Sequence, residues 1–160
     1  MLQYKVIVFG VGFEFSLACD FRIVTKDSQL SLPEMKIGMI PGSGGSARLA
    51  KMIGISRTKN IIMRGKRLSG EEAFQLGIAC EVVEKSELEN MTKKIVKELL
   101  GVSPLAQRTI KSVLNSTQNA TLYTSIDLEG EAYGRLRSSN DFKEGVKSFS
   151  EKRPPSYKGN

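Results

Sequence analysis

The chain has 160 residues, of which 40% are hydrophobic, and this suits one globular domain with one core. Its formal net charge is +7, and it contains two cysteines and no histidine. Two cysteines are too few for a disulfide framework, and the lack of histidine removes the commonest zinc and iron ligand. We therefore expect no metal site. A general acid or base must be a carboxylate, a lysine or a tyrosine.

Hydropathy and charge also exclude two classes of partner. No run of about 18 apolar residues is present, and the first ten residues lack the layout of a secretory signal, so we expect a cytoplasmic location and no membrane partner. The lysines are scattered along helical faces, only 7% of residues are aromatic, and no recognition motif occurs, so nucleic-acid binding is not expected. The positive charge suits either an anionic ligand or solubility alone.

The first third of the chain predicts short strands joined by glycine turns. Strands are expected at residues 4–9, 21–24 and 29–32, because β-branched and apolar residues are concentrated there. A short buried helix is expected at residues 14–18, after a turn at Gly10-Val11-Gly12. The run PGSGG at residues 41–45 predicts a sharp turn, since it combines proline with three glycines.

The rest of the chain reads as helices joined by brief turns. Helices are expected at residues 46–52 and 57–63, with Gly54 closing the first and Ser56 capping the second. Ser69 and Glu72 form a capping box for a helix that Gly77 closes, and a strand should follow at residues 78–83. Further helices are expected at residues 86–100, from Pro104 onward, at 122–136 and at 142–149, followed by an extended tail. The buried stripe of the Pro104 helix should comprise Leu105, Ile110, Val113 and Leu114.

Two glutamates lie where carboxylates are unusual. Glu14 stands in the otherwise apolar run FEFSLAC at residues 13–19, and Glu34 follows Pro33 in similar company. Burying a carboxylate is costly unless it is paired or used, so the pair could converge on one pocket and divide acid and base roles. The alternatives are a helix-start carboxylate favoured by the dipole for Glu14 and a surface helix cap for Glu34.

The glycine runs do not match nucleotide-binding motifs. Gly10-Val11-Gly12 lacks the third glycine of the dinucleotide fingerprint, and neither run ends in the Gly-Lys-Ser/Thr of a P-loop. A turn at Gly10 to Gly12 can instead bare backbone N–H groups at a helix start, where they could hold a developing oxyanion.

Several motifs together resemble the enoyl-CoA hydratase (crotonase) family. They are GVGFE at residues 10–14, ACD at 18–20, LPE at 32–34, GMIPGSGG at 38–45, KRLSGEEA at 66–73, SPLA at 103–106 and FSEKR at 149–153. The separation of Glu14 and Glu34, 34 − 14 = 20 positions, is the spacing of the family's catalytic pair. The resemblance covers nearly the whole chain.

The resemblance implies an α/β fold of the crotonase-like (ClpP/crotonase) type, a spiral of ββα turns with a helical C-terminal trimerisation region. We expect a partial spiral core carrying the glutamates at residues 1–100 and a helical oligomerisation region at 101–160, giving a homotrimer or a dimer of trimers. Family members carry further spiral turns before this point. The chain is therefore expected to be an N-terminally truncated crotonase.

The resemblance also implies a chemistry, the addition of water to a 2-enoyl-CoA thioester or its reverse. Glu14 and Glu34 would be the catalytic pair, and the backbone N–H of Val11 an oxyanion donor, although its side chain replaces a glycine and crowds the thioester. Coenzyme A is part of the substrate, so no separate cofactor is expected. The residues expected to bind substrate are Gly10, Gly12, Pro41, Gly42, Phe149 and Lys152.

Alternatives remain open beside this assignment. Phe149 could be a packing residue only, and Lys152 could be a solvent-exposed charge with no ligand. The chain could be an enoyl-CoA isomerase, although isomerases of the family often keep one glutamate and this chain has both Glu14 and Glu34. It could also be a catalytically silent remnant that only oligomerises.

Overall fold

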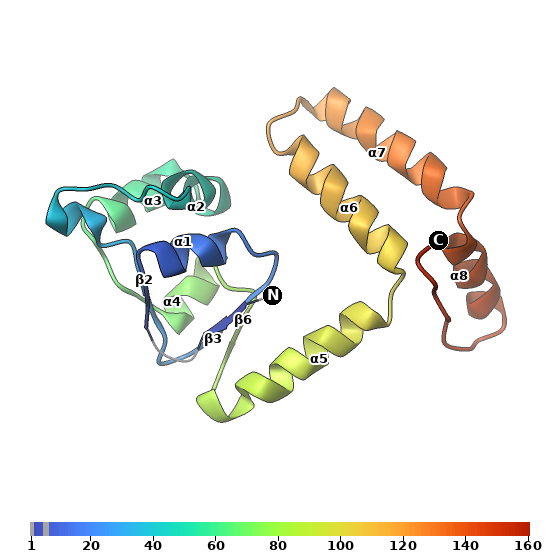
Figure 1. The fold of residues 1–160 in the computed structure, drawn as a ribbon, viewed down its shortest axis with the longest axis horizontal. Coiled ribbons are helices and arrows are strands. Elements are labelled where there is room, and N and C mark those ends of the chain that lie inside the picture. The colour runs from blue at the N-terminus through green and yellow to red at the C-terminus, as the bar shows by residue number, and fades with distance from the viewer. Residues whose placement is uncertain (1, 5–6) are drawn as a thin grey trace. The chain divides into compact units, whose positions relative to one another are not determined.

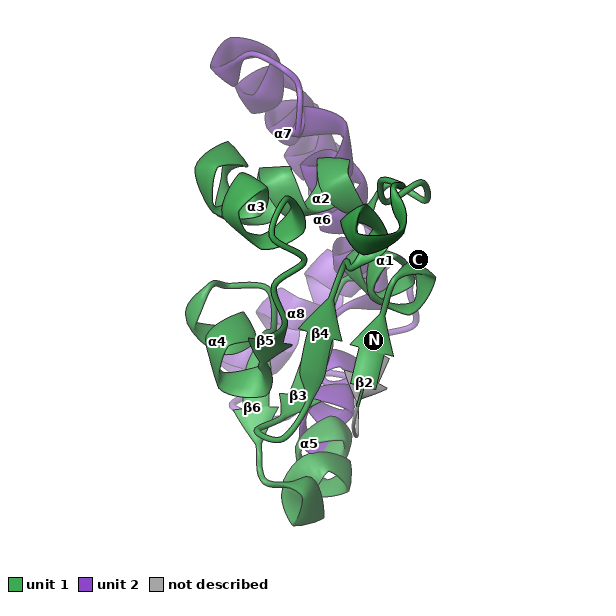
Figure 2. Cartoon of the chain, turned by 90° about the vertical axis from the view of Figure 1, so that its left-hand side faces the viewer, with its two compact units in different colours: residues 1–93 green, residues 94–160 purple. Residues whose placement is uncertain are grey.

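A computed structural model describes residues 2–4 and 7–160, with side chains described from residue 7 onward. Met1, Lys5 and Val6 lie outside the described residues, so the strand predicted at residues 4–9 cannot be followed through its middle. The chain divides into two compact units, residues 1–93 (unit 1) and 94–160 (unit 2), shown in different colours in Figure 2.

The described strands of unit 1 form two small sheets of three strands each. The first sheet has the order β1 (Leu2–Tyr4), β3 (Arg22–Thr25), β6 (Glu81–Val83), and its strands are parallel. The second has the order β2 (Ile7–Phe9), β4 (Gln29–Ser31), β5 (Leu68–Ser69); β2 pairs with β4 in parallel and β4 with β5 antiparallel. The strands predicted at residues 21–24 and 29–32 are confirmed, and they lie in different sheets.

The strand predicted at residues 78–83 is shorter than expected. Its first part is drawn back toward the preceding helix, because the N–H groups of Ile78 and Ala79 both donate to the carbonyl of Ala73, at 2.9 and 3.1 Å. Cys80 then donates to Arg22 O at 2.8 Å, and the parallel pairing with β3 begins only at Glu81.

Helices pack around these sheets and supply most of the core. They are α1 (Val11–Leu17), the 3-10 helix η1 (Glu34–Ile37), α2 (Gly45–Ile53), α3 (Ile55–Ile62), α4 (Gly70–Gln75) and the 3-10 helix η2 (Lys85–Glu87). The apolar core joins one side of each main helix to the strands; its fully buried members are Phe13, Val24, Leu30, Leu32, Leu49, Leu68, Ala73 and Ile78. This core fixes α1 and α2 against the ends of the strands.

The predicted cap at Ser56 is wrong. Gly54 has φ 82° and serves both as the C-cap of α2 and as the N-cap of α3, so α3 starts at Ile55 without an intervening linker. Ser56 therefore lies inside the helix. A sequence pattern finds a capping side chain readily but not a glycine shared by two helices.

The capping box of α4 is confirmed. Ser69 Oγ accepts from Glu72 N at 3.1 Å, and Glu72 Oε2 accepts from Ser69 N at 2.9 Å. Lys66 donates to the other carboxylate oxygen of Glu72 at 2.8 Å, and this bond, followed by the one from Ser69 N–H, lowers the pKa of Glu72. Gly77, at φ 75°, ends the helix as predicted.

Replacing Ser69 by alanine should destabilise the chain by about 1 kcal/mol, because one helix-start N–H loses its acceptor. Urea denaturation followed by circular dichroism would measure the change. Ser69→Thr, which keeps a hydroxyl at the cap, is the matched control. Equal stability of Ser69→Ala and wild type would contradict a role for the box in stability.

Unit 2 is made of helices. The helix α5 (Leu88–Leu100) contains the boundary between the units, and α6 (Pro104–Thr117), α7 (Leu122–Arg137) and α8 (Asn140–Ser150) follow. Figure 1 shows α6 and α7 side by side, and the two helices are in contact. Ser103 accepts from Ala106 N at 3.1 Å with Pro104 at the first helical position, as the sequence predicts. None of the described helices is long and apolar enough to cross a membrane.

The predicted buried stripe of α6 is only partly formed. Ile110 is 49% exposed and Leu114 is 59% exposed, whereas Leu105 and Val113 are half-buried. Among the described residues of unit 2 that are apolar, only Ala132 is buried. The amphipathic pattern of α6 therefore marks an apolar face that its own unit does not cover.

Candidate functional site

The site is built on the turn between β2 and α1. Gly10 has φ 55° and ψ −128°, a backbone conformation that favours glycine, and it lets the chain leave the strand and start the helix at once. Gly10 N donates to Ser31 O at 3.0 Å and so ties the end of β2 to the end of β4. As a result α1 begins at Val11, earlier than the predicted start at residue 14.

Glu14 lies in the first turn of α1 and is only 1% exposed. Its backbone N–H donates to Gly10 O at 3.0 Å. Its side-chain oxygen Oε2 accepts from two backbone N–H groups, Ser43 N and Gly45 N, both at 2.7 Å. Gly45 is the first residue of α2 and Ser43 stands just before its N-cap, Gly44. Around a helix start, N–H groups lack helical partners and the helix dipole favours negative charge. The hydrogen bonds to this buried carboxylate thus come from the segment that opens another helix.

Gly45 leaves room for this carboxylate. A Cβ placed on Gly45 would lie 2.6 Å from Glu14 Cγ and 2.9 Å from Glu14 Oε2, distances that real Cβ atoms do not show. Any side chain at this position would therefore displace Glu14.

Glu34 lies close to the same turn. It is half-buried at the start of η1, and its Oε1 lies 3.0 Å from a Cβ placed on Gly10. Its Oε2 is the one buried side-chain oxygen or nitrogen, among the described residues, that has no hydrogen-bond partner. Buried polar atoms are normally satisfied, so this oxygen is available to a ligand or to water.

Both predicted catalytic residues therefore adjoin Gly10. The Oε1 atom of Glu34 lies 3.0 Å from a Cβ placed on Gly10. Glu14 follows Gly10 by one helical turn, and its backbone N–H donates to the carbonyl of Gly10. The two carboxylates are held differently, since Glu14 has one oxygen fixed by two N–H groups and Glu34 has one oxygen free. Such unequal surroundings are expected where two carboxyl groups divide acid and base roles.

The other residues predicted around Gly10 lie at the start of α1. Val11 and Gly12 occupy the first two helical positions, where backbone N–H groups have no acceptor within the helix. The Val11 side chain is 66% exposed, so it projects away from the core. A Cβ on Gly12 would meet Val8 Cγ1 at 3.5 Å, an ordinary contact.

The loop before α2 was only partly anticipated. Pro41 is buried and Gly42 is exposed, with nothing within 4 Å of a Cβ placed on Gly42. The groups that contact a glutamate are instead the N–H groups of Ser43 and Gly45, which sequence reasoning missed. The available signal was the Gly44-Gly45 pair opening a helix, a common place for N–H groups that bind a carboxylate.

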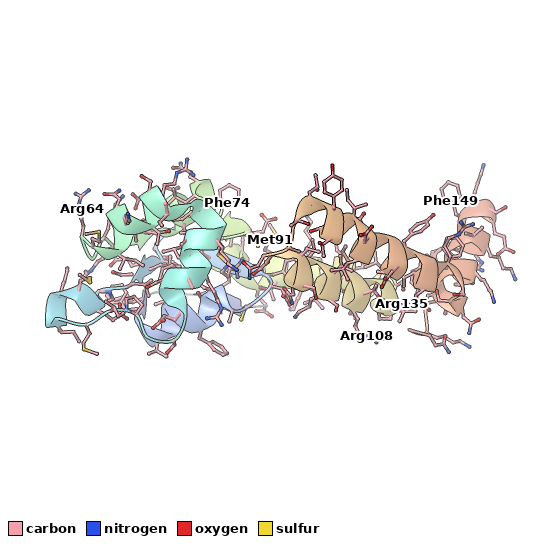
Figure 3. All side chains as sticks on the ribbon, turned by 90° about the horizontal axis from the view of Figure 1, so that it is seen from above. Arg64, Phe74, Met91, Arg108, Arg135 and Phe149 are labelled. Atoms are coloured by element: carbon pink, nitrogen blue, oxygen red, sulfur yellow. The ribbon has the colours of Figure 1, made fainter. Side chains whose placement is uncertain are left out.

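Phe149 and Lys152 belong to unit 2, not to the unit that carries the glutamates. Phe149 projects from the end of α8 and is 87% exposed (Figure 3). Lys152 has φ 53°, unusual for a residue with a side chain, and its N–H donates to Phe149 O at 3.2 Å. Within the described part of the chain, no group of three or more Cys, Asp or Glu residues could hold a metal ion.

The chain is similar to known proteins over nearly its whole length. The sequence model of the family "Enoyl-CoA hydratase/isomerase" matches residues 6–160. The mitochondrial methylglutaconyl-CoA hydratase of Mus musculus is 34% identical over 157 residues, covering 96% of this chain and 50% of that protein. The short-chain-enoyl-CoA hydratase of Clostridium acetobutylicum is 33% identical over 144 residues, covering 90% of this chain and 55% of that protein.

Solved structures agree as well. The enoyl-CoA hydratase of Bacillus anthracis superposes with a TM-score of 0.94 at 38% identity, covering 96% of this chain and 60% of that chain. The enoyl-CoA hydratase of Mycobacterium tuberculosis gives a TM-score of 0.92 at 26% identity, covering 97% and 62%.

The chain spans about half the length of the curated relatives it matches. Over nearly all of its own length it has the α/β crotonase fold that the motifs predict. The chain belongs to the enoyl-CoA hydratase/isomerase family.

Proposed function

We propose that this chain provides the acid/base pair for adding water to a 2-enoyl-CoA thioester, or for the reverse dehydration. The observation that carries the proposal is that two carboxylates beside one glycine turn differ in their hydrogen bonding. Glu14 is buried with Oε2 bonded to two N–H groups, while Glu34 keeps a buried oxygen without a partner. Coenzyme A enters as part of the substrate, and the reaction requires no other cofactor.

The geometry supports one division of roles. Because Ser43 and Gly45 hold Oε2 of Glu14, its other oxygen is left to orient a water molecule and take its proton. The water oxygen then bonds to the β-carbon, and the electron pair of the double bond moves toward the thioester oxygen. Glu34, in its protonated form, gives its proton to the α-carbon. Glu14 is then protonated and Glu34 ionised. Transfer of one proton from Glu14 to Glu34 through solvent restores the starting protonation states.

The start of α1 suits the charge that develops in this reaction. The N–H of Val11 has no helical acceptor and would hold the thioester oxygen as it becomes negative. Gly10 and Gly12 would let the thioester approach the backbone, and Pro41 with Gly42 would border it. Phe149 and Lys152 would contact the CoA bound to a neighbouring copy in a homotrimer or a dimer of trimers. The expected location is the cytoplasm.

Apolar side chains near the glutamates suit the acyl part of such a ligand. Val11 and Phe15 are 66% and 65% exposed on α1, and Met39 and Ile40 are 60% and 69% exposed after η1. Exposed apolar side chains of this size mark sites that contact another molecule or another segment. An acyl chain attached to CoA is one such molecule.

Two other functions remain as alternatives. An isomerase would move a proton within the acyl chain, and the presence of both glutamates at the turn favours hydration over this. A silent subunit would only self-assemble, a possibility that the exposed apolar face of α6 supports, with Ile110 at 49% and Leu114 at 59% exposed.

Glu14→Gln and Glu34→Gln should each reduce hydration of crotonyl-CoA by about 100-fold or more, because each removes a proton-transfer group. Loss of the enoyl-thioester absorbance measures the rate. Glu71→Gln, an exposed carboxylate on α4, is the matched control and should be as active as wild type. Full activity in both test variants would refute the assignment. A folded wild-type chain with no hydration activity would favour the silent subunit.

Gly45→Ala should reduce the same rate by about 100-fold while the chain stays folded, because the new Cβ displaces the Glu14 carboxylate, and small misplacements of a catalytic group have effects of that size. Gly130→Ala on α7 is the matched control, since nothing lies within 4 Å of a Cβ there. Circular dichroism verifies that both variants fold. A Gly45→Ala variant with wild-type activity would show that the two N–H groups do not position the base.

A further inference from the structure

Unit 2 contains a buried carboxylate that the proposed chemistry does not use. Asp141, in the first turn of α8, is 3% exposed. Its Oδ1 accepts from two backbone N–H groups near the end of the chain, Lys158 N and Gly159 N, both at 3.0 Å. Its Oδ2 accepts from Ser103 Oγ at 2.6 Å. One side chain thus joins the start of α6, the start of α8 and the C-terminal residues.

Further bonds fix the same end of the chain. The backbone N–H of Asp141 donates to Asn160 O at 3.1 Å, and Arg108 Nη2 donates to Gly159 O at 3.0 Å. A Cβ on Gly159 would lie 3.2 Å from Pro104 Cγ, so the backbone lies close against the start of α6. The tail has no regular secondary structure, as predicted, but it is tied down.

A second carboxylate on α8 holds the beginning of this tail. Glu144 accepts hydrogen bonds from Arg153 Nη1 at 2.6 Å and Nη2 at 3.0 Å, and also from Ser156 N at 2.8 Å. Paired N–H bonds from arginine to a carboxylate are strong and directional. Glu144 follows Asp141 by three residues, so the two carboxylates lie on one face of α8.

Tyr157 lies between these two anchors and lines a groove. A Cβ on Gly145 would be 3.2 Å from the Tyr157 hydroxyl oxygen, so the ring packs against α8 where no side chain intervenes. Tyr157 lines an open groove of about 530 Å³, together with Tyr133, Phe142 and Phe149, and all of the groove's lining residues belong to unit 2. The tail therefore forms part of the groove wall.

We propose that residues 153–160 form a C-terminal strap that Asp141 and Glu144 clasp onto α8, and that this strap closes one side of the apolar groove through Tyr157. Releasing the two carboxylate contacts would free the strap and open the groove. Because Arg153 follows Lys152, the clasp also holds the turn that carries Lys152 and Phe149. The proposal rests on contacts within unit 2 and holds whether or not the chain hydrates enoyl-CoA.

The charge state of the clasp fits this role. The Ser103 hydroxyl, followed by the Gly159 and Lys158 N–H groups, lowers the pKa of Asp141, and Arg153 lowers the pKa of Glu144 to about 2. Both carboxylates are therefore ionised at neutral pH. Arg153 and Lys147 are the charged groups that act on Glu144, and Glu151 bonds to the same Arg153. Lys158 lines a hollow together with Asp141 and Glu144, and Arg108 binds the carbonyl of Gly159.

Amide hydrogen exchange measured by NMR on the whole chain tests the strap directly. In wild type, the amides of Ser156, Lys158 and Gly159 should be protected, and a nuclear Overhauser contact should join the Tyr157 ring to Gly145. Glu144→Ala should raise the exchange rate of the Ser156 amide by about tenfold or more and weaken that contact, because a charged hydrogen-bond partner is lost. Asp141→Ala should do the same for the Lys158 and Gly159 amides.

The control is Asp127→Ala, which removes an exposed carboxylate on α7 and should leave the strap amides unchanged. Protection of the α8 amides shows whether each variant keeps its fold. If Asp141→Ala does not fold, the result for Glu144→Ala alone tests the proposal, since this substitution lies inside a helix. Unprotected strap amides in wild type, or unchanged exchange and Tyr157 contact in Glu144→Ala, would overturn the proposal.

Acid should release the strap over a defined range. The folded-state pKa of Glu144 is lower than its ordinary value, so its contacts favour docking above pH 4.5 and are lost as the pH falls toward about 2. The difference in Ser156 exchange between wild type and Glu144→Ala should therefore be full at pH 5 to 6 (on the order of tenfold) and shrink toward pH 2. A difference that stays constant over this range would show that the ionised carboxylate is not what holds the strap.

Discussion

The two N–H groups of Ser43 and Gly45 that hold Glu14 are the interaction on which the rest of the site depends. A buried carboxylate is unfavourable in a core of leucine and phenylalanine unless donors compensate for its lost water. Here both donors bond a single oxygen at 2.7 Å and belong to the start of α2. Since α1 carries the carboxylate and α2 the donors, the packing of these helices sets the position of the proposed base. Gly45 makes the approach of Glu14 possible, and Glu34 Oε1 lies 3.0 Å from a Cβ placed on Gly10.

A similar arrangement appears in unit 2 with a different consequence. Asp141 and Glu144 also accept backbone N–H groups, but those groups come from the end of the chain and not from a helix start. In unit 1 the donors hold the carboxylate of the proposed base in place, whereas in unit 2 the carboxylates hold a segment in place. Both arrangements satisfy carboxylate oxygens with backbone N–H groups. One oxygen of Glu34 has no partner in unit 1, and a groove beside Phe149 is open in unit 2.

Much of the fold was predictable because local signals were strong. The capping box at Ser69, proline at the first position of α6 and the turn before α2 all appear where the residues indicate. Local patterns could not show that β3 and β4 join different sheets, that Gly54 serves two helices, or that Ile110 and Leu114 stay exposed, because these features depend on distant partners. The glutamate pair was predicted from its apolar surroundings and, through the family resemblance, from its spacing of 20 positions. Its backbone donors, Ser43 N and Gly45 N, were missed because nearly every residue carries an N–H group, and only the Gly44-Gly45 pair opening a helix pointed to them.

The most direct test of the central claim is an NMR titration of the whole chain with butyryl-CoA, a saturated thioester that cannot be hydrated. If the glycine turn and its two glutamates form a thioester site, the amide signals of Val11, Gly12, Ser43 and Gly45 should shift together and saturate. Signals that stay fixed in a folded sample at millimolar thioester, while Glu14 still accepts from Ser43 and Gly45, would contradict the claim.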